Sequence, residues 1–122
     1  MKQKVHSVSY LVKAEFEFKN GVYDLAALPT GAEVVKVSLE VVGNPTAGSI
    51  SVGFKDEDTK NYFLTLDNTI SSDYKNHVTS AKDYTATSNK VVVAEVKNAA
   101  GNDTKGVLRV VYFLPSVIEV EY

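Results

Sequence analysis

The residue types that most often carry catalysis are scarce and scattered in this sequence. The only histidines, His6 and His77, stand far apart, and the chain has no cysteine. A Ser-His-Asp site needs a histidine close to a nucleophile and a carboxylate. The stretch SISVG resembles a nucleophile elbow around Ser51, but Ser49 stands where the first glycine belongs and no helix pattern follows. We therefore expect a protein that is not an enzyme.

One acidic cluster, Asp56 to Asp58, has the chemistry of a calcium site. Carboxylate oxygens suit calcium, but Lys60 stands where a further ligand belongs and Asn61 replaces the glycine of the EF-hand loop. Asp56 and Asp58 are therefore weak metal candidates, and a solvated loop tip is the simpler interpretation. The sequence contains no cofactor-binding motif, so we expect no cofactor.

Composition and charge exclude several classes of partner. The net charge is −2, and Arg109 is the only arginine, so a basic surface for nucleic acid is not expected. No segment approaches the roughly 20 apolar residues of a membrane-spanning helix, which argues against a membrane partner. The N-terminal stretch lacks the apolar run of a signal peptide, so we expect synthesis in the cytoplasm without export by a signal of its own.

Alternating apolar and polar residues predict two long strands in the first part of the chain. Residues 8–18 place their apolar members on one face, except for Leu11, which falls on the polar face. Asn20-Gly21 predicts a hairpin with a short return strand over 22–25, because both residues tolerate positive φ. Pro29-Thr30-Gly31 predicts a stiff turn. The second long strand follows this turn, with its core-facing residues Val35, Val37, Leu39 and Val41.

The rest of the chain predicts shorter strands between dense turns. The turn GNPTAG predicts the end of the second long strand, and further strands are predicted over 49–54 and 62–66. Residues 90–97 and 106–114 predict a hairpin across AAGNDTKG, and 116–122 a last edge strand suited to pairing with a neighbour. About eight strands without an amphipathic helix predict an all-β chain, a single antiparallel β-sandwich over residues 1–122, either jelly-roll-like or immunoglobulin-like.

Residues 67–89 form a polar excursion that contains three aromatic or titratable residues of interest. Tyr74, His77 and Tyr84 stand among Ser, Thr, Asn and Asp, a composition found in loops that contact sugars or proteins. The alternative is that these side chains anchor the excursion onto the sandwich, because long loops need internal packing. The second interpretation is favoured.

Two strands carry apolar residues on both faces. In VVVAEV and VLRVVYF the polar alternation of a solvent-facing strand is missing. Either another layer of the same chain or another subunit must cover the second face. A chain of 122 residues leaves little for a third layer, so we expect an oligomer interface. Its candidate residues are Val91, Val93, Val107, Arg109, Val111 and Phe113.

The order of these elements resembles that of small β-sandwich structural proteins of tailed bacteriophages. The likeness is carried by LPTGA at 28–32, SISVG at 49–53 and the strand over 107–113. The resemblance implies a virion component, such as a capsid decoration, head-fibre, or minor head or tail protein, often oligomeric. It implies no catalytic residue.

The leading hypothesis is therefore a non-enzymatic virion structural protein that acts through protein–protein contacts. Its expected partners are itself, as a homo-oligomer with a trimer as one arrangement, and other virion proteins. The alternative is a carbohydrate- or receptor-binding module that uses residues 67–89, for which a glycan would be the partner.

Overall fold

The computed structural model describes residues 2–6, 8–67, 77–114 and 117–121, and all its regular elements are strands. In the described part of the chain, no helix is long and apolar enough to cross a membrane. The all-β prediction is confirmed. The strands are β1 (Lys2–His6), β2 (Ser9–Glu17), β3 (Gly21–Leu28), β4 (Glu33–Phe54), β5 (Leu64–Leu66), β6 (His77–Ser80), β7 (Tyr84–Thr85), β8 (Lys90–Phe113) and β9 (Val117–Glu121).

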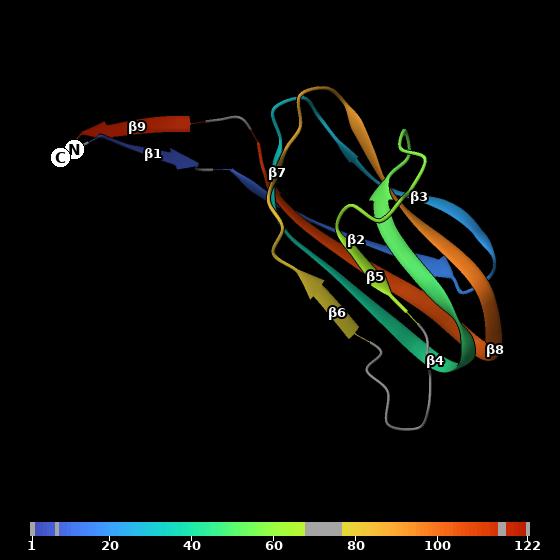
Figure 1. The fold of residues 1–122 in the computed structure, drawn as a ribbon. Helices are drawn as coiled ribbons and strands as arrows, with labels where there is room; N and C mark the ends of the chain where they lie inside the picture. Colours follow the sequence, from blue (N-terminus) through green and yellow to red (C-terminus); the bar gives the residue numbers. More distant parts are fainter. Residues whose placement is uncertain (1, 7, 68–76, 115–116, 122) are drawn as a thin grey trace.

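Strands β2 to β8 form one antiparallel sheet that folds over into two layers (Figure 1). One layer runs from β2 through the second half of β8 and the first half of β4 to β6 and β7. The other runs from β3 through the first half of β8 and the second half of β4 to β5. This strand order is that of a jelly roll, so the topology decides between the two sandwich types that the sequence left open.

The two longest strands create the fold because each of them bends and belongs to both layers. β4 and β8 pair along their whole length, with register shifts between Val42 and Ser49. Two predictions are wrong here. The GNPTAG stretch does not end a strand, and AAGNDTKG does not close a hairpin. Each is the bend of a continuous strand, and Gly43, Gly48 and Gly101 supply positive φ at the bend.

The predicted hairpin at Asn20-Gly21 is also wrong. β2 and β3 do not pair with one another, because each lies beside a different half of β8. The chain instead crosses from one layer to the other at this turn. Asn20 stabilises the crossing by accepting a hydrogen bond from the backbone N–H of Ala99 at 2.8 Å. Asn20 and Gly21 predict a turn, but packing decides which strand the chain pairs with after that turn.

The turn at Pro29-Thr30-Gly31 is confirmed, and a bulge follows it. Gly31 has a φ of 88° and donates a backbone hydrogen bond to Ala86. The register of β4 against β8 then shifts between Val34 and Lys36. Val34 becomes fully buried while Val35 stays half-buried, so the prediction of Val35 as a core residue is wrong.

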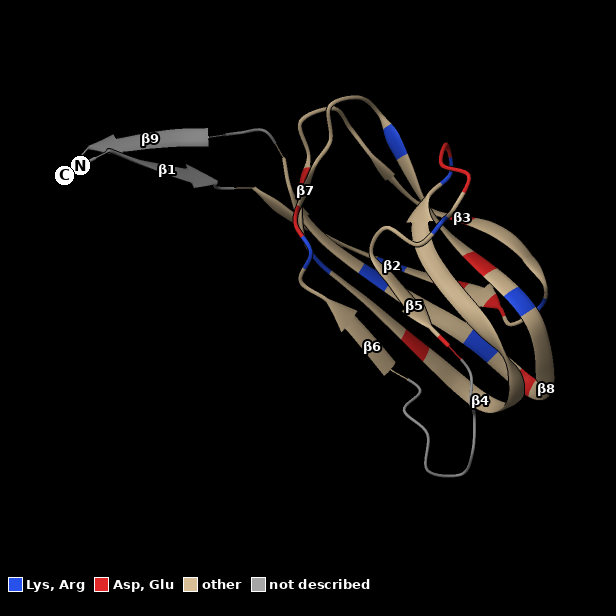
Figure 2. Cartoon of the chain, in the orientation of Figure 1, with Lys and Arg blue, Asp and Glu red and all other residues tan. Residues whose placement is uncertain are grey.

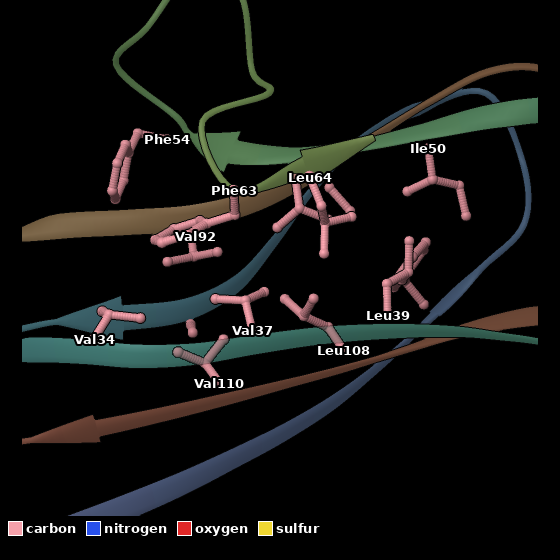
Figure 3. Close-up of a cluster of buried hydrophobic side chains, with 14 of the residues drawn as sticks. Val34, Val37, Leu39, Ile50, Phe54, Phe63, Leu64, Val92, Leu108 and Val110 are labelled. Carbon is pink, nitrogen blue, oxygen red and sulfur yellow. The ribbon is translucent and has the colours of Figure 1, made fainter. Parts of the chain in front are cut away.

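The core lies between the two layers and is almost purely apolar (Figure 3). Valines and leucines of the first layer face those of the second, and the aromatic ring of Phe54 closes one end of this cluster. Among the described residues, Ser38 is the only buried polar or charged residue. Burial of apolar area without buried charge is therefore what stabilises this fold.

The two terminal strands lie apart from this sheet. β1 pairs with β9 in a separate two-stranded antiparallel sheet, which projects from one end of the sandwich (Figure 1). It follows directly on the β2–β8 pair, whose last bond joins the N–H of Leu114 to the carbonyl of Val8 at 3.0 Å. We call β1 and β9 the terminal ribbon.

Candidate interaction surface

The layer of β2, β8 and β4 turns its second face away from the core. At one end of that face β2 and β8 carry mainly apolar residues, while β4 places Lys36 opposite Val111 and Glu33 opposite Phe113. By register, Leu11 lies opposite Val111, and the next row places Ser9 opposite Phe113. Alternate residues of a strand share a face, so Leu11, Val111 and Phe113 lie together. Leu11 is 62% exposed, and the other two are partly exposed. We call these three residues the outer patch.

The other end of this face is charged, and Val107 is buried there with 4% exposure. Val107 lies between Glu15 and Glu40 in register. Lys105 pairs with Glu15 at 3.3 Å, and Arg109 pairs with Glu40 at 3.6 Å. The apolar stems of such long side chains cover apolar neighbours. Val107 is thus covered within its own chain and adds little area to an intermolecular contact.

Val91 and Val93 lie in the other layer, where the chain also covers itself. Val93 has no exposed surface and lies opposite Gly53 in register. A Cβ atom at Gly53 would lie 2.7 Å from backbone atoms of Lys60 and Asn61, so the loop after β4 crosses this face closely. The sequence left open whether the same chain or another subunit covers this face. At Val93 it is the chain's own loop that covers it. Val91 is half-buried.

Leu11 was not among the predicted interface residues, although a signal for it was present. Period-two alternation assigns Leu11 to the polar face of its strand, where it is a lone apolar residue among Ser9, Lys13 and Glu15. Only the pairing of β2 with β8 brings it beside Val111. The structure therefore narrows the candidate surface to the outer patch, with Arg109 at its charged border.

Of the three candidate residues in the excursion, the two that the structure describes, His77 and Tyr84, do not form one binding loop. The ring of Tyr84 lies 4.5 Å from that of Phe54 and 5.4 Å from that of Tyr62, which anchors its segment to the core. His77 is exposed on β6, opposite Glu40 in register. Tyr74 lies outside the described residues. The contacts of Tyr84 favour the anchoring interpretation, and they give the glycan-binding alternative no support.

The weak metal candidates, Asp56 and Asp58, lie in an exposed loop. Among the described residues, no group of three or more His, Cys, Asp or Glu is arranged to hold a metal ion. Asp56 pairs with Lys90, whose Nζ lies 2.6 Å from Oδ2 of Asp56. The hydrogen bond from Lys90 is the main reason why the pKa of Asp56 is lowered, and the same bond raises the pKa of Lys90. Asp58 is exposed.

Replacing Lys90 by methionine is expected to raise the pKa of Asp56 toward its ordinary value of 3.8, because the hydrogen bond to the ionised carboxylate is lost. A lowered folded-state pKa means that this pair stabilises the fold above the ordinary pKa. That contribution is lost as the pH falls through the lowered value. Carboxyl-carbon NMR titration of Asp56 measures the change.

The matched control for this titration is Lys60→Met. Lys60 also lies beside the acidic loop, but its Nζ donates to the backbone carbonyl of Glu57 at 2.7 Å rather than to a carboxylate. The Lys60→Met substitution should leave the titration of Asp56 unchanged. Equal midpoints for Asp56 in the wild type and in Lys90→Met would contradict the assigned pair.

Charges elsewhere are interspersed rather than gathered. Figure 2 shows lysine and arginine segments lying among aspartate and glutamate segments over both layers. The described ion pairs lie at the surface, where they contribute little to stability. The outer patch is therefore distinguished by its apolar character and not by charge.

Solved bacteriophage capsid structures contain chains that are similar to this one. It matches a chain of the acidic stable capsid structure of Helicobacter pylori bacteriophage KHP30 with 77% sequence identity, covers 100% of both chains and has a TM-score of 0.93. It also matches a chain of the cyanophage Pam1 capsid asymmetric unit with 20% identity and a TM-score of 0.70, covering 88% of this chain and 85% of that one. The Pam1 likeness shows the fold alone. No family model and no curated protein matches the chain.

Proposed function

This chain belongs to a family of bacteriophage capsid proteins, shared with the KHP30 chain, and from that premise we propose that it decorates the capsid shell without catalysing a reaction. It is a virion structural protein. The observation that carries the proposal is the match to the KHP30 capsid chain over the full length of both chains. The decoration role, as distinct from building the shell itself, is the part that needs a test.

The way in which the chain buries its core supports a decoration role. The apolar cluster is completed by β2 to β8 of a single chain, and its largest side chains are fully buried there. A chain that completes its own core can fold before it meets a partner. Such a unit suits addition to a shell that already exists.

We further propose that the chain acts as a homo-oligomer, with a trimer as one arrangement. The outer patch supports this, because Leu11 is 62% exposed beside Val111 and Phe113. Exposed apolar residues that adjoin one another are typical of protein–protein contacts. Other virion proteins would then meet surfaces of the oligomer that the outer patch does not occupy.

The decoration role is tested by adding the purified chain to capsids that were produced without it and sedimenting the mixture. We expect the chain to pellet with intact shells and to saturate at a fixed ratio. The control is the same chain sedimented alone, which should stay in the supernatant. Failure of shells to form without the chain would assign it to the shell itself, and a chain that stays free beside intact shells would also overturn the proposal.

A further inference from the structure

The first layer of the sandwich ends in a long strand that has a partner on one side only. In the described part of the chain, β2 pairs with β8 and with no other strand. The other edge strands are short or interrupted: β5, β6 and β7 have three, four and two residues, and β3 has a register shift between Asp24 and Ala26. β2 pairs with β8 over nine residues without a shift. Short and bulged edges resist pairing with other chains, so β2 is the edge best able to accept another strand.

Two hydrogen bonds show which backbone groups of β2 point away from β8. The N–H of Leu114 donates to the carbonyl of Val8 at 3.0 Å, and the N–H of Phe18 donates to the carbonyl of Thr104 at 3.3 Å. Both bonds continue the β2–β8 register, so the even-numbered residues bond to β8 and the odd-numbered ones face the other way. No described backbone hydrogen bond outside the β2–β8 pair uses the central groups that face away. We call these N–H and C=O groups the free edge, and they belong to Leu11, Lys13 and Glu15.

The side chains along the free edge carry charges in an order that limits which strand can pair with it. Lys13 and Glu15 are both exposed on the outer face, where they are neighbours in the row of alternate residues. Opposite charges directly across a strand pair stabilise it, and like charges destabilise it. A partner strand therefore needs an acidic residue opposite Lys13 and a basic residue opposite Glu15.

A second copy of the same strand meets this requirement in one register. Antiparallel pairing of two β2 strands about a two-fold axis at Ala14 places Lys13 of each copy opposite Glu15 of the other. An axis at Lys13 or at Glu15 places two like charges opposite one another, and an axis at Val12 places Lys13 opposite Leu11. The register at Ala14 also sets the free edge of one copy against that of the other, as antiparallel hydrogen bonds require.

We propose that two copies of this chain pair through the free edges of β2, antiparallel and about a two-fold axis at Ala14. The proposal rests on the homo-oligomer proposed above and names a contact that forms it. The contact is isologous, so it gives a dimer by itself or joins two larger rings. Glu15 pairs with Lys105 of its own chain through Oε2, which leaves Oε1 to accept a hydrogen bond from Lys13 of the second copy.

The absence of cysteine in the chain makes a direct test available. Lys13→Cys is introduced into one preparation and Glu15→Cys into another that carries a size tag, and the two are mixed and oxidised. We expect a disulfide-linked dimer of mixed size, which can arise only between copies. Opposite residues of a hydrogen-bonded pair lie about 5.5 Å apart between Cα atoms, within the range of a disulfide. The second ion pair of the two-fold contact is retained in this mixture.

Val22→Cys replaces Glu15→Cys as the matched control. Val22 is also an exposed strand residue, with 46% exposure, but it lies on β3 in the other layer. The mixture of Lys13→Cys with Val22→Cys should give several-fold less of the mixed dimer. Equal amounts in test and control would overturn the proposal.

Reversing one charge at a time gives a second test that does not depend on oxidation. Lys13→Glu places like charges opposite one another at both ion pairs, and should raise the dissociation constant of the contact about tenfold or more. Glu15→Lys alone should act in the same way, whereas a mixture of the two variants should pair again, because every lysine then faces an acid. Light scattering over a concentration series measures each mass. Lys97→Glu, which changes an exposed lysine of the other layer, should leave the mass unchanged.

The outcomes separate this contact from the function proposed above. A monomeric wild-type chain would overturn both the homo-oligomer and the edge contact. An oligomer whose mass does not respond to Lys13→Glu, or a mixture of the two charge variants that does not pair, would overturn the edge contact alone. A chain that forms the mixed dimer but stays free beside intact shells would overturn the decoration role and support the edge contact.

Discussion

Replacing Phe54 by alanine is expected to lower the free energy of unfolding by about 3–5 kcal/mol, the usual cost of a large aromatic side chain removed from a core. Phe54 is 2% exposed at the end of β4. Its ring centroid lies 4.5 Å from Tyr84, 5.2 Å from Tyr62 and 5.3 Å from Phe63. These rings join β4, the segment before β5, and β7, so the cavity would loosen three segments together.

The change is measured by denaturant unfolding followed by fluorescence or circular dichroism. Val22→Ala is the matched control, since Val22 is apolar, lies in a strand and is 46% exposed. It should alter the free energy of unfolding by no more than about 0.5 kcal/mol, as expected for an exposed position. Equal losses for the two variants would show that Phe54 does not organise the core.

Replacing Gly43 by alanine is expected to destabilise the fold by about 2–6 kcal/mol, from backbone strain and overpacking of about 1–3 kcal/mol each. Gly43 has a φ of 118°, which L side chains rarely adopt. A Cβ atom there would meet the backbone of Asp103 and Thr104, which belong to the facing bend of β8. Because the obstacle is backbone and not the end of a flexible side chain, both strands would have to move apart.

Thr46→Ala in the same bend is the control for this substitution. Thr46 is exposed and lies in the same register-shifted part of β4, so its replacement tests the bend without the steric conflict. Both variants are compared by thermal unfolding, with the shift in melting temperature as the readout. A Gly43→Ala protein as stable as Thr46→Ala would mean that the bend does not depend on the close approach of the two strands.

The bends of β4 and β8 separate the parts of the fold that the sequence could predict from those that it could not. Strand residues were identified from period-two alternation over 8–18 and around Val37 and Leu39, because each strand buries one face. The dense turns were identified from glycine, proline and asparagine, because these residues permit the needed φ values. Yet GNPTAG and AAGNDTKG have the same local composition whether they reverse the chain or bend a strand. Only the long ladder between β4 and β8 distinguishes the two.

The candidate surface was predictable to a similar extent. Apolar residues on both faces of the strand over 107–113 indicated that the second face needs a cover. The identity of the cover depends on distant segments. Val107 lies under ion pairs from neighbouring strands, and Val93 lies under the loop after β4. Leu11 belongs to the outer patch because the pairing of β2 with β8 places it opposite Val111.

The sequence by itself therefore determined the all-β class, the main strands, the scarcity of catalytic chemistry and a resemblance to phage structural proteins. These follow from local properties, namely side-chain alternation, turn preference and residue type. The tertiary structure decided the jelly-roll order, the crossing at Asn20-Gly21, the outer patch and the pairing of the chain ends. Each of these depends on contacts between residues far apart in the chain, and the free energy of such contacts comes from burial that local patterns do not specify.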